Sequence, residues 1–340
     1  MVVTAAAFLA LLLSAILSEP PITWVFAAIF VACAIGLSIA AARSGRPYII
    51  FVLPALAFYA LFVVFPTIEA FRVSLYRWNG MGEPVNFIGL ENFSNVLQSD
   101  VFYNAFWHNF VLFAAIFILQ NTLGLLLAVL LNGKPRFFEL YRAIIFSPVI
   151  ISLVATGLIW QLIFGSNIGL LTPVLQGLGL DFLVRDWLGD DIVTFWLLVI
   201  VQFWQWMGLP MIIFLAGLQN IPEELSAAAK IDGANDFQAF RHVTFPLLAP
   251  AFTVVTGLSF ISMFKVFDIP FVMAGAGGSP DGTTDVLGLV IYRTAFGLGT
   301  TVGTSMQQGY AVAIGIYMFL IILVVATIQL IVLRRREVSL

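Results

Sequence analysis

The sequence predicts an all-α integral membrane protein with eight transmembrane helices. Hydrophobic residues make up 61% of the 340 residues and charged residues 10%, against roughly 45–50% and roughly 25% in soluble proteins. Eight stretches of at least 18 residues contain no Asp, Glu, Lys or Arg, and about 20 apolar residues suffice for one membrane-spanning helix. An isolated strand in lipid would lack hydrogen-bond partners, so each stretch is expected to be helical.

The charge-free stretches define a two-part organisation. Residues 1–47 are expected to form two N-terminal helices that are poor in polar residues, and residues 48–340 a six-helix core. The first stretch also has the apolar character of a signal peptide, but it lacks a positively charged start, so it is expected to remain as a helix. The predicted helices are 2–17, 22–42, 48–70, 107–131, 143–165, 192–218, 246–270 and 309–333.

The positions of Lys and Arg predict the orientation in the membrane. Ten of them fall on the side that carries both termini: Arg43, Arg46, Lys134, Arg136, Arg142, Lys230, Arg241, Arg334, Arg335 and Arg336. Four fall on the other side, in longer loops: Arg72, Arg77, Arg185 and Arg293. Because cytoplasmic loops are enriched in these residues, we expect a multi-pass protein of the cytoplasmic membrane, in the lipid bilayer, with both termini cytoplasmic.

The inner loop 219–245 has the local signals of a helix-turn-helix. Pro222 suits the first helical position, an alanine run follows, and Gly233 suits the position just beyond the helix end. Asn235 and Gln238 have the spacing of a capping box for a second short helix. The exposed face would fit a groove on a cytoplasmic partner or lie on lipid headgroups. Its candidate contact residues are Glu223, Glu224, Ala228, Ala229, Asp232 and Gly233.

Several kinds of chemistry have no support in the sequence. No Gly-x-x-x-x-Gly-Lys-Ser/Thr loop is present, so ATP binding by this chain is not expected. The two histidines and one cysteine form no metal-binding pattern, and no enzyme motif is found. A net charge of −3, with Arg334–Arg336 as the longest basic tract, gives no support for a nucleic-acid partner. Transport or membrane assembly remains, without a cofactor or metal.

Amide and indole side chains cluster on the predicted helix 192–218. Gln202, Trp204, Gln205 and Trp206 are followed by Gly208 and Pro210, which can bend the helix. Amides pair with hydroxyls and indole rings stack on sugar C–H faces, so the cluster suits a polyhydroxylated ligand. The same residues would also fit an interfacial tryptophan belt with interhelical amide bonds. Gln120 and Asn121 form a weaker amide pair on helix 107–131.

Two opposite charges fall within the predicted helix 246–270. Lys265 and Asp268 are three residues apart and can face the same side of a helix. Since a buried charge at a helix centre costs about 2.5–3.5 kcal/mol on insertion scales, mutual pairing is the simpler interpretation. A role in gating or binding is the alternative.

The inner loop resembles the permeases of binding-protein-dependent ABC importers. Pro222–Ala234 (PEELSAAAKIDGA), Phe237–Phe240 and Thr244–Pro246 match the family's Glu-Ala-Ala loop, although Ala227 stands where the motif has glutamate. Trp206–Pro210 and Phe87–Phe93 (FIGLENF) resemble the sugar-importer branch. The resemblance covers about 48–340, and the extra N-terminal helix pair is similar to the maltose-type subunit.

The resemblance implies the partners and the ligand site. Such permeases work as a pair, with a second permease subunit, an ATP-binding cassette ATPase dimer docked on the inner loops, and an extracytoplasmic solute-binding protein. The substrate would be a sugar or related polyol, and ATP would be bound by the partner subunits. By position, the family's ligand contacts fall on Trp206, Gly208, Met211, Ser259 and Met263. With the amide–indole cluster, the candidate substrate residues are Gln202, Trp204, Gln205, Trp206, Gly208, Met211, Ser259 and Met263.

Two other functions are kept as alternatives. A secondary, ion-coupled transporter would need its own coupling site in the membrane, for which Lys265 and Asp268 are the evident candidates. A membrane assembly factor that transports nothing would have no need of the Gln/Trp cluster.

Overall fold

The computed structural model describes residues 52–165, 169–279, 282–298 and 306–334, and within these ranges it is helical. A single isolated antiparallel bridge, between Tyr76 and Phe87, is present in the described part of the chain. The chain divides into two compact units, 1–73 and 74–340. The two predicted N-terminal helices and the predicted boundary after residue 47 lie outside the described residues.

The described part of the first unit is one apolar helical stretch with a π-helical turn. It comprises α3 (Leu53–Tyr59), the turn Ala60–Val64 and α4 (Phe65–Val73). Pro66 lies just after this turn. A proline ring conflicts with the carbonyl four residues earlier, and widening the preceding turn relieves that conflict. This stretch corresponds to the predicted helix 48–70.

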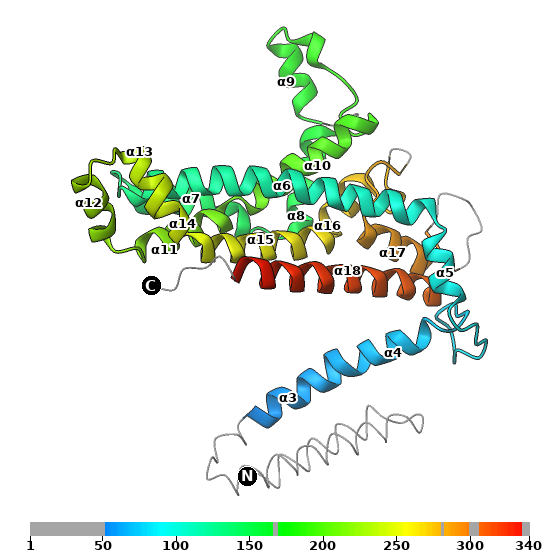
Figure 1. The fold of residues 1–340 in the computed structure, drawn as a ribbon. Coiled ribbons are helices and arrows are strands. Elements are labelled where there is room, and N and C mark those ends of the chain that lie inside the picture. Colours follow the sequence, from blue (N-terminus) through cyan, green and yellow to red (C-terminus); the bar gives the residue numbers. More distant parts are fainter. Residues whose placement is uncertain (1–51, 166–168, 280–281, 299–305, 335–340) are drawn as a thin grey trace, which may run out of the picture. The chain divides into compact units, whose positions relative to one another are not determined.

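The second unit is a bundle built around two long helices, α6 and α18 (Figure 1). Helix α6 packs against α11 and α15, and α18 packs against α15 and α17. Helices α12 and α13 lie at one end of this unit and α5 at the opposite end. The helices are α5 (Glu91–Leu97), α6 (Asp100–Asn132), α7 (Phe138–Ile150), α8 (Leu153–Phe164), α9 (Leu171–Gly177), α10 (Asp191–Trp206), α11 (Gly208–Gln219), α12 (Glu223–Ile231), α13 (Asp236–Ala239), α14 (Phe245–Leu247), α15 (Ala249–Phe264), α16 (Asp268–Ala274), α17 (Leu287–Phe296) and α18 (Gln308–Arg334).

The number of membrane spans differs from the simple sequence prediction. Among the described residues, two helices are long and apolar enough to cross a membrane, 100–132 and 308–332. Three bent helix pairs raise the number to five if each pair is one span. The structure therefore supports an all-helical membrane fold, whereas the count of eight helices is not confirmed.

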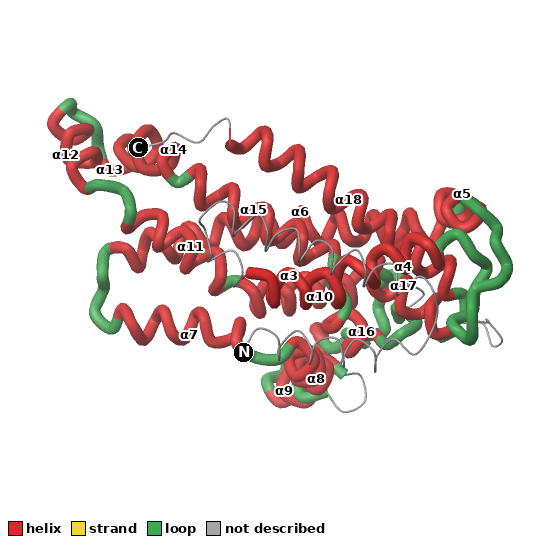
Figure 2. The backbone as a smooth tube through the Cα atoms, turned by 90° about the horizontal axis from the view of Figure 1, so that it is seen from below, coloured by secondary structure: helices red, strands yellow, loops and turns green. Residues whose placement is uncertain are grey.

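The predicted helix 143–165 is broken into α7 and α8, which meet at 95°. The tube view shows α7 lengthwise and α8 nearly end-on (Figure 2). Pro148 lacks the N–H that would continue the helical ladder, and Ile151 and Ser152 take extended backbone angles with ψ of 138° and 135°. The amide of Gln205 donates to the carbonyls of Pro148 at 2.7 Å and Ile151 at 2.9 Å. Hydrophobicity alone did not reveal this break.

The bend predicted at Gly208 is confirmed. Helices α10 and α11 meet at 43° there. Gly208 packs against α7 so closely that a Cβ would lie 2.7 Å from the Ile145 carbonyl oxygen and the Phe146 Cα. This contact therefore depends on the absence of a side chain at residue 208.

The predicted helix 246–270 also ends early, and the predicted pairing of Lys265 with Asp268 is wrong. Helix α15 ends at Phe264, and Asp268 begins the separate helix α16. The three residues between them break the helix, so the two charges are no longer one turn apart. Across the described ranges, neither residue takes part in an ion pair within 4.0 Å.

Candidate functional site

A small, mostly apolar pocket with a few polar groups lies where α6, α10, α11 and α15 meet. Its volume is about 20 Å³, which is room for roughly one water molecule. Its lining residues are Gln120, Trp206, Leu209, Pro210, Ile213, Val255, Leu258, Ser259, Ser262 and Met263. These lining residues could contact one side of a sugar, but the pocket is too small to enclose one.

Close helix packing places Gln120 beside the bend. Gly124, one turn after Gln120 on α6, faces α11 so closely that a Cβ would lie 2.9 Å from Pro210 Cβ and 3.3 Å from the Met211 nitrogen. Met211 is fully buried in the same region with Phe214, Leu215 and Leu248. The small residue at 124 therefore lets the start of α11 approach α6.

The polar atoms of the pocket are only partly paired. Ser259 Oγ donates to Gln120 Oε1 at 3.2 Å, and this bond orients the amide. Gln120 Nε2 is buried and has no hydrogen-bond partner in the described part of the protein. A buried N–H that is left unpaired costs about 1–3 kcal/mol.

The structure brings three of the eight candidate substrate residues to this pocket, namely Trp206, Ser259 and Met263. The other candidates are Gln202, Trp204, Gln205, Gly208 and Met211, which do not line it. Gln205 is fully buried, and besides its bonds to the α7–α8 break its Oε1 accepts from the Thr156 hydroxyl. Trp204 packs edge-on against Trp160 with ring centroids 5.5 Å apart.

Gln202 lies on α10 one turn before Trp206. It is buried, and its Oε1 has no hydrogen-bond partner among the described residues.

Gln120 was outside the set of candidate substrate residues. Its only signal in the sequence was an amide in the middle of an apolar helix. Sequence spacing could not show that it meets Ser259, which is 139 residues away.

The loop 219–245 forms the predicted helix-turn-helix. Helix α12 ends in a Schellman arrangement, in which Gly233 N–H donates to the Lys230 carbonyl at 3.1 Å and Ala234 N–H to the Ala229 carbonyl at 2.9 Å. Gly233 has a φ of +90°, a value that favours glycine, as expected for the residue just beyond the end of a helix. Pro222 is the N-cap rather than the first helical residue. The capping box of Asn235 and Gln238 is present, with both bonds at 2.9 Å.

This helix pair, residues 222–239, presents an exposed apolar and acidic surface. Ile231 is 87% exposed and Phe237 68% exposed. The exposed candidate contact residues are Glu223, Glu224, Ala228, Asp232 and Gly233, while Ala229 is half-buried. Lys230 and Asp236 form an ion pair of 2.7 Å that links the two helices, and Lys230 lowers the pKa of the Asp236 carboxyl.

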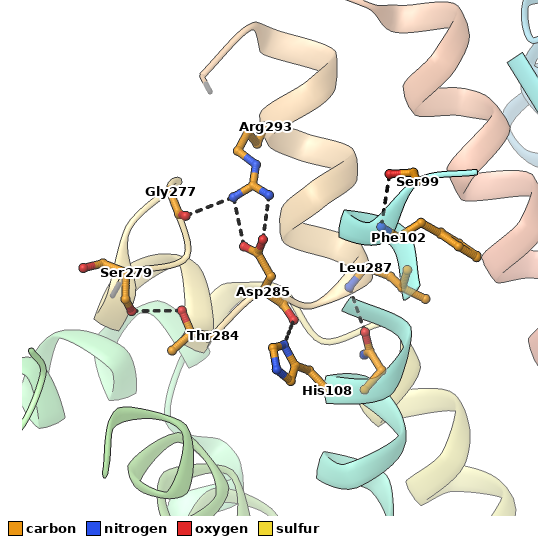
Figure 3. Close-up of polar contacts among 10 residues, drawn as sticks. Ser99, Phe102, His108, Gly277, Ser279, Thr284, Asp285, Leu287 and Arg293 are labelled. Carbon is orange, nitrogen blue, oxygen red and sulfur yellow. Dashed lines mark hydrogen bonds and ion pairs between the residues drawn. The ribbon is translucent and has the colours of Figure 1, made fainter. Parts of the chain in front are cut away.

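A buried ion pair organises the Gly-rich loop between α16 and α17 (Figure 3). Arg293 donates to both carboxylate oxygens of Asp285, at 2.9 and 2.6 Å, and to the carbonyl of Gly277 at 2.9 Å. His108 of α6 lies 2.9 Å from the Asp285 carbonyl oxygen. Burial raises the pKa of the Asp285 carboxyl, and Arg293 opposes that effect.

Asn109, next to His108, joins three helices. Its Nδ2 donates to the Met263 carbonyl at 2.7 Å, and its Oδ1 accepts from the Leu287 N–H at 2.7 Å. The end of α15 and the start of α17 are thus attached to α6. Met263 also lines the membrane pocket, so this amide helps to hold one of the pocket walls.

A second hollow, of about 820 Å³, lies at the α5 end of the second unit. Its lining residues are Arg77, Trp78, Asn79, Met81, Glu83, Val85, Glu91, Asn92, Asn95, Met306, Gln307 and Tyr310. Arg77 and Glu91 are ion-paired, and Trp78 Nε1 donates to the Gly82 carbonyl at 3.0 Å. Gly309 N–H, at the start of α18, donates to the Trp78 carbonyl at 3.1 Å, so the loop 74–90 is folded against the start of α18.

Comparison with known proteins places the chain in a family. A model of the family "Binding-protein-dependent transport system inner membrane component" matches residues 120–338. The chain is 35% identical, over 84% of its length and 94% of the relative, to the probable ABC transporter permease protein YurN of Bacillus subtilis (strain 168). It is also 35% identical, over 87% of its length and 97% of the relative, to the probable starch degradation products transport system permease protein AmyD of Thermoanaerobacterium thermosulfurigenes.

A solved structure has the same fold. A chain of a bacterial ABC transporter, which imports the acidic polysaccharide alginate, superposes with a TM-score of 0.71 at 22% identity. The match covers 88% of this chain and 98% of that one. At this identity the likeness concerns the fold alone. The family match and the two relatives show that the chain belongs to the family of binding-protein-dependent transport system inner membrane components.

Proposed function

We propose that the chain is the permease subunit of an ATP-driven ABC importer for a neutral or charged carbohydrate or a related polyol. The observation that carries this proposal is the pocket in which the Trp206 ring, the Gln120 amide and the Ser259 hydroxyl meet between transmembrane helices. Amides and hydroxyls bind sugar hydroxyls, and an indole ring packs on a sugar face. Two relatives are named for transport of starch degradation products and arabinooligosaccharides, which agrees with this substrate class.

We propose one partner protein for each of three surfaces of the chain. The 20 Å³ pocket is too small for a sugar, so we propose that a second permease subunit supplies the opposite wall. The exposed surface of α12 and α13 would dock in a groove of an ATPase dimer, which binds the ATP. The polar hollow beside α5, at the end of the bundle opposite α12, would face an extracytoplasmic solute-binding protein.

The proposed substrate residues are Trp206, Ser259, Met263 and Gln120, which line one pocket. The proposed coupling residues are Glu223, Glu224, Ala228, Ala229, Asp232 and Gly233. Gln205 is left out of the substrate site because its amide is already bonded to the α7–α8 break and Thr156. An ion-coupled mechanism has less support, since Lys265 lies exposed in the break after α15, whereas Asp268 begins α16.

The Lys/Arg distribution predicts the orientation, with both termini cytoplasmic. Reporter fusions after Arg46, Arg142, Arg241 and Arg336 should read cytoplasmic. Fusions near Asn92, Asp186 and Gly282 should read extracytoplasmic. An extracytoplasmic signal at Arg241 would contradict this orientation, because it would place the ATPase-docking surface on the wrong side.

Trp206→Ala should lower sugar uptake without loss of assembly. Removing the ring removes a stacking contact of about 0.5–1.5 kcal/mol, which corresponds to roughly a 2- to 10-fold lower rate. The measurement is uptake by proteoliposomes that contain the complete transporter, with ATP inside and no ion gradient. Trp196→Ala is the matched control, since Trp196 is on the same helix, is 48% exposed and does not line the pocket.

Two results would count against the proposed function. Uptake that needs an ion gradient but no ATP would favour the ion-coupled alternative. Equal uptake by Trp206→Ala and the unmodified protein would move the substrate site away from this pocket.

A further inference from the structure

We propose that the turn between α6 and α7, residues 133–137, and the exposed face of α7 together bind an anionic phospholipid. Lys134 and Arg136 hold its phosphate, and its acyl chains lie along α7. None of these residues lines the membrane pocket or the hollow beside α5. The lipid site is therefore separate from both, and it does not depend on what the chain transports.

The α6–α7 turn lies where a membrane span ends. Helix α6 is long and apolar enough to cross a membrane over residues 100–132. Lys134 is the first charged residue after the charge-free stretch 101–133. The turn therefore lies at the level where acyl chains give way to head groups, in either orientation of the chain. From this turn, α7 runs along one side of the second unit (Figure 2).

The outward face of α7 is apolar and is not covered by the described part of the protein. Successive large side chains on this face are three or four residues apart, so they lie on one side of the helix. They are Phe137, Leu140, Tyr141 and Ile144, which are 60%, 54%, 47% and 59% exposed. The other side of α7 packs on α11, where Gly208 meets the Ile145 carbonyl. The outward face is thus free to contact acyl chains.

Lys134 and Arg136 place positive charge at the start of this apolar face. Both are exposed, and neither forms an ion pair within 4.0 Å in the described part of the chain. The Arg136 guanidinium lies over the Phe137 ring, 5.2 Å from its centroid. The one acid nearby in the sequence, Glu139, is paired with Arg142 at 2.6 Å. Two uncompensated cations beside an apolar face match a lipid phosphate with its chains.

Two backbone hydrogen bonds order the turn that carries these cations. Lys134 N–H donates to the Leu131 carbonyl at 2.9 Å, and Phe138 N–H donates to the Pro135 carbonyl at 3.0 Å. Phe137 is the N-cap of α7, and its side chain cannot accept from the first N–H groups of the helix. Those groups are left for an outside acceptor, which adds to the preference for an anion.

A lipid accounts for both parts of the surface, whereas a free phosphate or a water-soluble partner accounts for one. A free phosphate gains nothing from the apolar face. A water-soluble protein reaches the turn but not the rest of α7, because α7 and α8 together have the length and composition of a membrane span. Ile150, at the far end of α7, is 76% exposed, so the apolar surface extends to the middle of that span.

The test counts the lipids bound to the purified full-length chain by native mass spectrometry. The micelles contain equal amounts of phosphatidylglycerol and phosphatidylcholine with identical acyl chains, and phosphatidylglycerol should be retained in preference. Lys134→Gln and Arg136→Gln should each lower the ratio of bound phosphatidylglycerol to phosphatidylcholine about 5-fold. The double variant Lys134→Arg with Arg136→Lys keeps both charges and should keep the ratio.

Arg185→Gln is the matched control for the loss of one charge. Arg185 is also exposed and also lies over an aromatic ring, 5.8 Å from the centroid of Trp187, but Asp186 is next to it. Its replacement should leave the lipid ratio unchanged. Equal retention of the two lipids by the unmodified protein would overturn the proposal. An equal fall of the ratio in Arg185→Gln and Arg136→Gln would do the same.

Three further measurements identify the occupant. Phe137→Asn removes the ring and keeps the positive φ of 67°, which Asn tolerates. It should lower retention of both lipids without changing their ratio, and unchanged retention would exclude acyl-chain contact at this face. Free glycerol phosphate should not displace bound phosphatidylglycerol, and displacement would show a site for a soluble phosphate instead. The complete transporter should keep the lipid preference of the single chain, and its loss there would assign this surface to a protein partner.

Discussion

Gly233→Val is expected to abolish transport and to weaken ATPase association, while the protein still inserts into the membrane. Gly233 has a φ of +90° at the end of α12, a conformation that costs a residue with a side chain about 1–2 kcal/mol or more. A Cβ at this position would meet nothing within 4 Å. The expected effect therefore comes from backbone strain that rotates α13 against α12, and not from a steric clash within the chain.

Ala228→Trp tests the same surface without changing the backbone. Ala228 is exposed on α12, so a bulky ring there fits the isolated chain but would clash with a partner seated on this helix. Glu224→Ala should produce a smaller loss, because Glu224 is one turn from Ala227, where the family motif has its glutamate. Co-purification of the ATPase and sugar uptake are measured for each variant.

Gly177→Val is the matched control for the backbone strain introduced by Gly233→Val. Gly177 also has open space where a Cβ would lie, but its φ is not positive. This variant should keep full association and transport. Full association and full transport in both Gly233→Val and Ala228→Trp would show that this helix pair is only a connector.

Asp285→Ala is expected to destabilise the second unit by about 3–5 kcal/mol, because it leaves the Arg293 guanidinium buried without its carboxylate. The side chains of Asp285 and Arg293 are only 7% and 13% exposed. Gly278 packs directly on the Asp285 carboxylate, and Gly282 is close to it, so the loop is built around this one charge. The unfolding midpoint of the purified protein in detergent should fall by about 6 °C or more.

Glu91→Ala supplies the control for this ion pair. Arg77 and Glu91 are also paired, but their side chains are 65% and 45% exposed, and exposed pairs contribute about 0–1 kcal/mol. The double variant Asp285→Ala with Arg293→Leu should recover part of the lost stability, since it removes the unpaired charge as well. An unchanged midpoint for Asp285→Ala would show that water reaches Arg293 and that the pair does not organise the loop.

Features that depend on near neighbours in the chain follow from the amino-acid sequence alone. The stop of α12 at Gly233 and the capping box of Asn235 with Gln238 are confirmed, because both involve bonds within six residues. The bend at Gly208 was predicted from the loss of side chain and N–H at Gly208 and Pro210. Apolar runs likewise predicted that the chain is helical and membrane-bound.

The roles of the buried polar residues, in contrast, depend on the tertiary structure. Gln202, Gln205 and Gln120 look alike in the sequence, as amides within apolar helices. Folding places Gln205 on the broken α7–α8 junction and Gln120 against Ser259 in the pocket. It also pairs Arg293 with Asp285 rather than Lys265 with Asp268. The physical reason is that a buried polar group must find a partner in whichever helix lies beside it, and that neighbour is set by packing between distant segments.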